Sequence, residues 1–160
     1  MSRGISRQRG FTLLEILVAL LVLSIGLLGL AGLQTFSLRN NHSAFLRSQA
    51  VVLAYDALDR MRSNRDQAML GTGSAYNTNY SQAAGSYSAT DCSSNCTSSA
   101  LATYDLVAWK ADVERLPAGQ AQITIDANNK ARVVVRWSDT RENSAVNNDT
   151  WTEVAVETLL

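Results

Sequence analysis

An uncharged apolar run near the N-terminus constrains this chain more than any other feature. Residues 16–33 carry no charge, and only Ser24, Gly26, Gly29 and Gly32 among them are not aliphatic. Eighteen such residues reach the lower length of a membrane-spanning helix. Because the hydrocarbon interior offers no water to backbone N–H and C=O groups, an open segment can satisfy them only as a helix. We therefore predict a transmembrane helix.

The flank before this run indicates its orientation and argues against an ordinary secretory signal. Arg3, Arg7 and Arg9 precede the run, and the first ten residues contain no acid, which favours a cytoplasmic N-terminus. An ordinary signal, the alternative, has an apolar core of about 7–15 residues followed by a small-residue cleavage site. Here the apolar run is longer, and the carboxylate of Glu15 stands at its start.

The residues around this charge carry a family resemblance. Arg9-Gly10-Phe11-Thr12-Leu13-Leu14-Glu15 resembles the class III signal of type IV prepilins and type II secretion pseudopilins. The resemblance implies that a prepilin peptidase cleaves after Gly10 and methylates the new N-terminal residue, Phe11. Glycine suits such a site because a side chain would obstruct close backbone approach. Residues 23–34 and the pattern Tyr104-Asp105…Trp109…Leu116-Pro117…Gly119 are most similar to PilV-type minor pilins.

Glu15 is the strongest candidate for a functional side chain. A carboxylate within an apolar segment is costly and marks function by default. Its own chain's amine, at Phe11 after cleavage, offers partial compensation. The family resemblance instead implies the N-terminal amine of a neighbouring subunit during filament assembly. The alternative without a function is a carboxylate resting at the head-group boundary.

Charge and length limit the remaining possibilities. The chain of 160 residues has 14 basic and 14 acidic residues, and cleavage after Gly10 would remove three arginines, leaving 11 basic, 14 acidic and a net charge of −3. This negative charge argues against a nucleic-acid partner. Once the apolar helix is set aside, the chain suffices for one small core.

We predict an α+β fold in four segments. Residues 1–10 are the leader, 11–33 the transmembrane half of a long spine helix, 34–65 its amphipathic half, and 66–160 a periplasmic or extracellular head. The whole helix would be about 80 Å long. Its second half carries one apolar stripe at helical spacing, on which the head can pack: Leu46, Ala50, Leu53, Ala54, Ala57, Leu58 and Met61. Gly26, Gly29 and Gly32 favour either close helix packing or a segment that melts on assembly.

The head is predicted to contain a long loop, a short helix and a three- or four-stranded antiparallel sheet. The loop covers residues 66–99. The helix covers 101–116, capped by Ser98 or Ser99 and ended by Pro117 and Gly119. Strands at 122–126, 132–137 and 151–158 alternate in polarity. Pairing Arg132 with Glu157 also pairs Val133 with Val156, Val135 with Val154 and Arg136 with Glu153. In the first hairpin, Ile125 is predicted opposite Val133.

The other candidate residues point to structural roles. Cys92 and Cys96 are predicted to form a small-loop disulfide in an oxidising compartment; their spacing is not a Cys-x-x-Cys redox motif. His42 is expected to face solvent, Asp105 to cap or tether the short helix, and Trp109, Trp137 and Trp151 to anchor the core. Asp139, Glu142 and Asp149 could bind calcium, but such loop charges are usually solvated. We expect no metal site, no cofactor and no catalytic centre.

The resemblance implies a minor pilin that enters type IV pili and helps to prime their assembly. Its partners would be the prepilin peptidase, other minor pilins, the major pilin and the inner membrane. The chain would cross the inner membrane once, with a periplasmic head, before reaching the pilus at the cell surface. A minor pseudopilin of a type II secretion system is one alternative. A subunit that contacts a ligand or DNA at the filament tip, through the 66–99 loop, is another.

Overall fold

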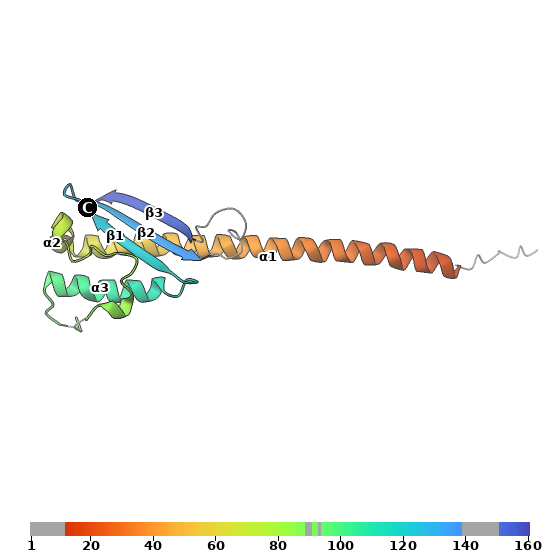
Figure 1. Ribbon diagram of the computed structural model, residues 1–160, viewed down its shortest axis with the longest axis horizontal. Helices are drawn as coiled ribbons and strands as arrows, with labels where there is room; N and C mark the ends of the chain where they lie inside the picture. Colours follow the sequence, from red (N-terminus) through yellow and green to blue (C-terminus); the bar gives the residue numbers. More distant parts are fainter. Residues whose placement is uncertain (1–11, 89–90, 93, 139–150) are drawn as a thin grey trace, which may run out of the picture. The chain divides into compact units, whose positions relative to one another are not determined.

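The computed structural model describes residues 12–88, 91–92, 94–138 and 151–160. Gly10 and Phe11, the loop acids Asp139, Glu142 and Asp149, and Ser93 lie outside this range. The fold is α+β, as predicted, with a long N-terminal helix, a short helix and a three-stranded antiparallel sheet (Figure 1). The chain divides into two compact units, Met1–His42 and Ser43–Leu160, here called unit 1 and unit 2. Helix α1 (Leu13–Ser63, 51 residues) contributes to both.

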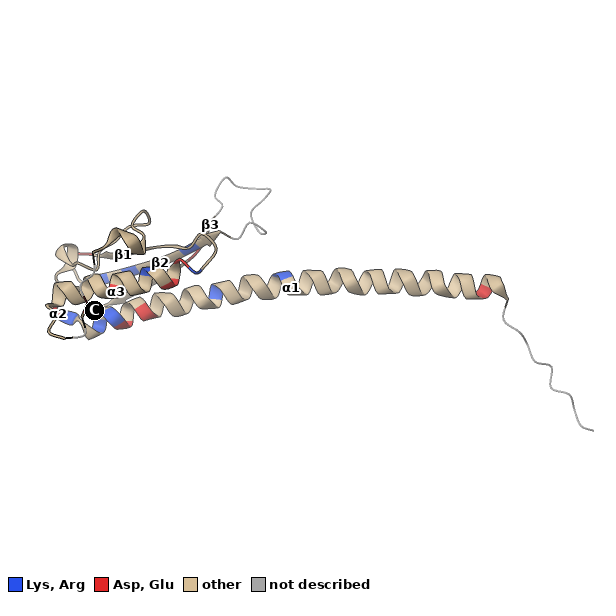
Figure 2. Ribbon diagram, turned by 90° about the horizontal axis from the view of Figure 1, so that it is seen from below, with Lys and Arg blue, Asp and Glu red and all other residues tan. Residues whose placement is uncertain are grey.

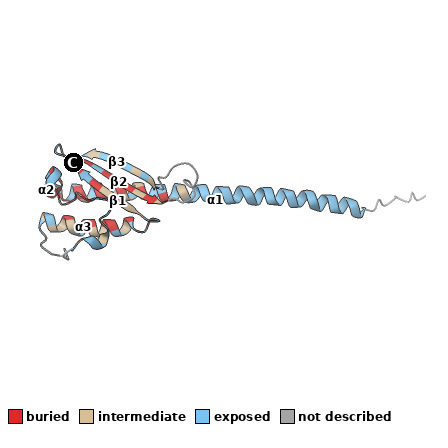
Figure 3. Ribbon diagram, viewed as in Figure 1, coloured by how far each residue is buried: buried red, intermediate tan, exposed pale blue. Residues whose placement is uncertain are grey.

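Unit 1 consists, in its described part, of the first half of α1. No residue of its apolar window is buried (Figure 3), and no charge interrupts α1 between Glu15 and Arg39 (Figure 2). Two hydroxyls of this segment bond within the helix: Ser24 Oγ donates to the carbonyl of Leu20 at 2.7 Å, and Thr35 Oγ1 donates to that of Ala31 at 3.0 Å. Internal pairing of this kind is what an apolar solvent requires.

Unit 2 is built around the predicted apolar stripe of α1. Residues 43–63 of α1 and helix α3 (Ser98–Val113) pack with the apolar face of the sheet, and their buried residues form one cluster. Six of the seven predicted stripe residues are buried, and Leu53 is partly buried against them. The short elements α2 (Arg65–Ala68), η1 (Gly71–Gly73) and η2 (Ala84–Ser86) lie in the segment predicted as a loop.

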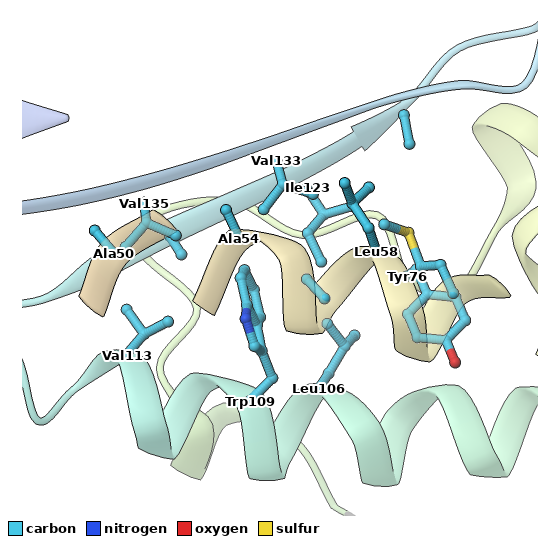
Figure 4. Packing of buried hydrophobic residues seen from close by; sticks show 14 of the residues in the cluster. Ala50, Ala54, Leu58, Tyr76, Leu106, Trp109, Val113, Ile123, Val133 and Val135 are labelled. Atoms are coloured by element: carbon cyan, nitrogen blue, oxygen red, sulfur yellow. The ribbon is translucent and has the colours of Figure 1, made fainter. Parts of the chain in front are cut away.

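Small residues on α1 make room for the largest core side chain. Trp109 projects from α3 toward α1, where Ala50 and Ala54 are fully buried (Figure 4). Its indole Nε1–H donates to the carbonyl of Leu53 at 2.8 Å. Indole therefore fills the space that alanines leave between two helices and also satisfies its polar atom. Trp137 is buried as predicted.

The sheet has the order β1–β2–β3, from β1 (Gln120–Ile125), β2 (Lys130–Ser138) and β3 (Trp151–Leu159). All four predicted pairs between β2 and β3 are confirmed. Glu157 makes ion pairs with Lys130 at 2.5 Å and with Arg132 at 3.4 Å. Charge on one face and valines on the other thus select the same register.

The predicted register of the first hairpin is wrong by two residues. Val133 lies opposite Ile123, and Ile125 lies opposite Ala131. The turn decides between these registers, because both keep the isoleucines on the apolar face. Asp126 Oδ1 accepts the backbone N–H groups of Asn128 at 2.8 Å and Lys130 at 2.9 Å. The loop is therefore residues 127–129, and its last residue, Asn129, has a φ of 60°, which asparagine tolerates.

Two further details differ from the predictions. Helix α3 begins at Ser98 and ends at Val113; its cap is Thr97, whose Oγ1 accepts the Ala100 N–H at 3.2 Å, and not Ser98 or Ser99. Because Thr97 precedes the two serines and its hydroxyl satisfies the Ala100 N–H, Ser98 and Ser99 are already part of the helix. Trp151 is only partly buried, since it lies on the outer face of the sheet, where the Arg136 guanidinium stacks 4.6 Å from its ring centroid. Cation–π contact replaces core packing at this residue.

Candidate functional site

Glu15 lies in the first turn of α1, where Thr12 begins the helix. The backbone N–H of Glu15 donates to Thr12 Oγ1 at 3.2 Å, so the threonine side chain caps the helix. Thr12 and Glu15 have the spacing of a capping box, in which an acid at the third helical position also favours the helix N-terminus. This structural role was missed in the sequence analysis, although the Thr-x-x-Glu pattern is its signal. Glu15 thus has a local reason to be in this turn besides its predicted role in assembly.

The apolar helix that follows is the second part of the candidate site. In the part of the chain that the structure describes, α1 is the one helix long and apolar enough to cross a membrane. Its window has a mean hydropathy of 2.7. A glycine Cβ built at Gly26, Gly29 or Gly32 would meet no atom within 4 Å. These three residues therefore present open backbone that a neighbouring helix can approach closely.

An exposed apolar stripe continues along α1 in unit 2, on the side away from the core. Phe45, Val52 and Tyr55 are 56%, 66% and 52% exposed. They are spaced by seven and three residues, which places them on one helix face. The buried stripe of the same helix already packs against α3 and the sheet. Residues 43–63 therefore bury one apolar face against the rest of unit 2 and expose these three apolar side chains among polar ones on the other side.

A buried polar network fastens α1 to the rest of unit 2. Asp105 of α3 accepts a hydrogen bond from Tyr76 Oη at 2.6 Å and from Arg60 Nη1 at 3.4 Å. Asn64 donates to Tyr76 Oη at 3.2 Å and to the carbonyl of Ser98 at 2.7 Å. Of the two roles predicted for Asp105, the structure therefore supports the tether and not the helix cap. Burial, together with the Asp105 carboxylate, raises the pKa of Tyr76 above its usual value.

Lys110 is a buried charge that no sequence pattern singles out. Its side chain is 2% exposed, and its Nζ donates to the carbonyls of Asn79 at 2.9 Å and Ala121 at 2.5 Å. It therefore ties the 66–99 segment to β1 from a position on α3. Burial lowers the pKa of Lys110 to about 8, and the charge of Glu114 opposes this shift. Helical spacing alone could not distinguish this lysine from one on the exposed face.

Cys92 and Cys96 form the predicted disulfide, with their Cα atoms 5.4 Å apart. The bridge closes a small loop immediately before Thr97, the cap of α3. The described residues contain no group of three or more His, Cys, Asp or Glu side chains arranged to hold a metal ion. His42 is exposed, as predicted. The candidate site thus consists of an apolar N-terminal helix, a small domain held together by a polar network, and exposed apolar side chains on α1.

Comparisons with known proteins agree with these features. A family model described as type IV pilin Tt1218 matches residues 32–107, and the model of the prokaryotic N-terminal methylation motif matches residues 5–31. No curated protein and no solved structure matches the chain. The two adjoining matches support a type IV pilin-like protein that carries a prepilin methylation motif. Proteins of this kind are generally structural subunits and not enzymes.

These matches also bear on processing and location. The methylation motif implies processing by a prepilin peptidase and assembly into pili. With the apolar helix, it fits anchoring in a membrane. The PilV-type resemblance is a finer subdivision and stays a prediction.

Proposed function

We propose that this chain is a minor pilin, which enters type IV pili in small amounts and helps to prime their assembly. The observation that carries the proposal is the methylation motif at residues 5–31 joined directly to the type IV pilin match at 32–107. The proposed division is a leader at 1–10, a transmembrane segment at 11–33, an amphipathic spine segment at 34–65 and a head at 66–160. The prepilin peptidase would cut after Gly10 and methylate Phe11.

The apolar faces of α1 supply a physical basis for assembly. Before assembly the apolar segment lies in the inner membrane, with the N-terminus in the cytoplasm and the head in the periplasm. On leaving the membrane, this segment must exchange lipid for other apolar helices. Glu15 would then pair with the N-terminal amine of a neighbouring minor or major pilin, which favours the register in which the buried charge is compensated. In unit 2, the exposed side chains of Phe45, Val52 and Tyr55 offer a further apolar contact to a neighbouring subunit.

A minor pseudopilin of a type II secretion system is the second candidate. The same motif and the same anchored helix support it, because both classes share the class III signal. The two differ in what the filament does, and deletion separates them. Loss of surface pili on deletion supports the pilus, and loss of protein secretion with normal pili supports the pseudopilin.

The first experiment is the mass of the mature protein and of its N-terminal peptide, from membranes and from sheared pili. The expected peptide begins at a methylated Phe11, and the chain is expected in both fractions. A mature chain that begins after residue 30 would mean an ordinary secretory signal and would overturn the proposal. A methylated Phe11 chain that is absent from pili would favour the pseudopilin.

A further inference from the structure

Unit 2 contains an uncharged polar cleft that none of the features above uses. Its volume is about 500 Å³, within the range of small-ligand sites of about 300–1,000 Å³. Seven of its nine lining residues are Thr, Asn or Gln, and the other two are isoleucines of β1. The cleft lies at the outer edge of β1, where residues 77–79 of the 66–99 segment run beside the strand.

Hydrogen bonds hold this segment rigidly against the edge of β1. The Thr78 N–H donates to the carbonyl of Ile123 at 2.9 Å, and the Ile125 N–H donates to Asn77 Oδ1 at 2.7 Å. Asn77 Nδ2 in turn donates to the carbonyl of Gly71 at 2.9 Å. One wall of the cleft is therefore a strand, and the other is a loop fixed to it at two points. A wall of this kind is preformed, so little order has to be gained on binding.

Several polar groups of the cleft remain available. Gln122 and Thr124 alternate with the buried isoleucines and so lie on the outer face of β1. Within the described residues, neither side chain makes a hydrogen bond to the protein. Gln82 uses its Oε1 for the Asn79 N–H at 2.9 Å and for Thr78 Oγ1 at 3.0 Å, which leaves its Nε2 donors. The cleft thus offers amide donors, amide acceptors and a hydroxyl together.

The absence of charge distinguishes this cleft from its neighbours. Residues 67–90 and 118–125 contain no charged side chain, although 18% of the chain is charged. The cleft beside Lys110 is lined by that lysine and Glu114, and the one between α1 and α3 is lined by Asp112 and Arg115. No charged residue lines this cleft, and the nearest cation along the sheet, Arg132 opposite Thr124, is paired with Glu157 at 3.4 Å. The lining therefore does not favour a phosphate or a nucleic acid backbone. With seven polar residues it does not suit an apolar ligand either.

We propose that this cleft binds a neutral saccharide. Sugar hydroxyls both donate and accept, so they match a surface of amide and hydroxyl groups that has no net charge. Gln122 and Thr124 form one wall of the site, and Gln82 contributes donors from the other. The inference goes beyond a pilin's role in assembly and does not depend on it, because binding is a property of the single subunit.

The test uses the full chain in detergent micelles, applied to immobilised neutral oligosaccharides and to sialylated or sulfated forms of the same oligosaccharides. Binding to at least one neutral oligosaccharide is expected. The double variant Gln122→Ala/Thr124→Ala should weaken that binding about tenfold, since it removes two hydrogen-bonding side chains. The matched control, Gln49→Ala/Thr152→Ala, removes the same two residue types outside the cleft and should change the affinity less than twofold.

Three outcomes would overturn the inference: no neutral oligosaccharide binds, the acidic forms bind better, or the control loses as much affinity as the cleft variant. Circular dichroism of both double variants distinguishes a lost contact from a lost fold. Methylation of Phe11 and presence in pili are measured independently, so failure of the saccharide site leaves the proposed filament function intact.

Discussion

The hydroxyl of Tyr76 donates a hydrogen bond of 2.6 Å to Asp105 Oδ2, and this contact joins two segments that are 29 residues apart in the chain. Asp105 also accepts a hydrogen bond from Arg60 of α1, so this carboxylate of α3 holds both α1 and the 66–99 segment. Removing the Asp105 carboxylate would leave the Tyr76 hydroxyl without its acceptor, and a buried donor left unpaired costs about 1–3 kcal/mol.

Replacing Asp105 with alanine should therefore lower the free energy of unfolding by about 2–4 kcal/mol. Tyr76→Phe should cost less, about 1 kcal/mol, since Asp105 keeps Arg60. The measurement is urea unfolding of the detergent-solubilised chain, followed by near-UV circular dichroism. A double-mutant cycle gives the coupling between the two residues; a coupling near zero would contradict the network described here.

Lys110 predicts a dependence of stability on pH. Its folded pKa of about 8 is below the value of 10.5 for an ordinary lysine. Between these values the unfolded chain binds the proton more than the folded chain does, so stability should rise with pH, by at most about 1.4 kcal/mol per pH unit. The raised pKa of Tyr76 has the opposite effect above pH 10, where the unfolded tyrosine ionises first.

The urea midpoint should accordingly increase from pH 8 to pH 10 and fall beyond it. Lys110→Met keeps the length of the side chain and removes its titration, so the rise should disappear while the fall above pH 10 remains. A rise that persists unchanged in this variant would show that another group is responsible.

Two proposed roles of the Glu15 side chain can be separated, support of the helix start and charge pairing during assembly. Glu15→Gln keeps a polar side chain that can cap the helix, whereas Glu15→Ala removes both roles. If the charge acts in assembly, both variants should enter the membrane normally and both should fall about tenfold or more in sheared pili.

Quantitative mass spectrometry of the membrane and pilus fractions measures this. Recovery of pilus incorporation by Glu15→Gln would assign the residue to capping alone. Normal incorporation of Glu15→Ala would show that assembly needs neither the charge nor the side chain.

The Cys92–Cys96 bridge should contribute about 2 kcal/mol, because its short loop limits the entropy it removes from the unfolded chain. Cys92→Ser/Cys96→Ser should lower the free energy of unfolding by about that amount and fray the start of α3, whose cap follows the bridge directly. Hydrogen exchange of the first α3 amides tests the second effect. Equal protection in both proteins would mean that Thr97 caps the helix without help from the disulfide.

Local pattern was sufficient for much of this fold. The apolar run was predicted from its length and its lack of charge. The stripe from Leu46 to Met61 and the alternation on β2 and β3 each bury one face at a fixed period, so the sequence predicted those elements and the β2–β3 register. Four pairs agreed on that register because charge and valine alternate together. The motif at residues 9–15 predicted the class of protein for a similar reason, since its chemistry lies in consecutive residues.

Tertiary structure decided what depends on contacts between distant segments. The register of the first hairpin depends on Asp126 reaching two amides, which periodicity does not describe. The burial of Lys110, the tethering role of Asp105 and the outward position of Trp151 depend on which segment covers each residue. Such packing is a many-residue property, and a helical or strand period fixes only the face on which a side chain lies, not what meets it there.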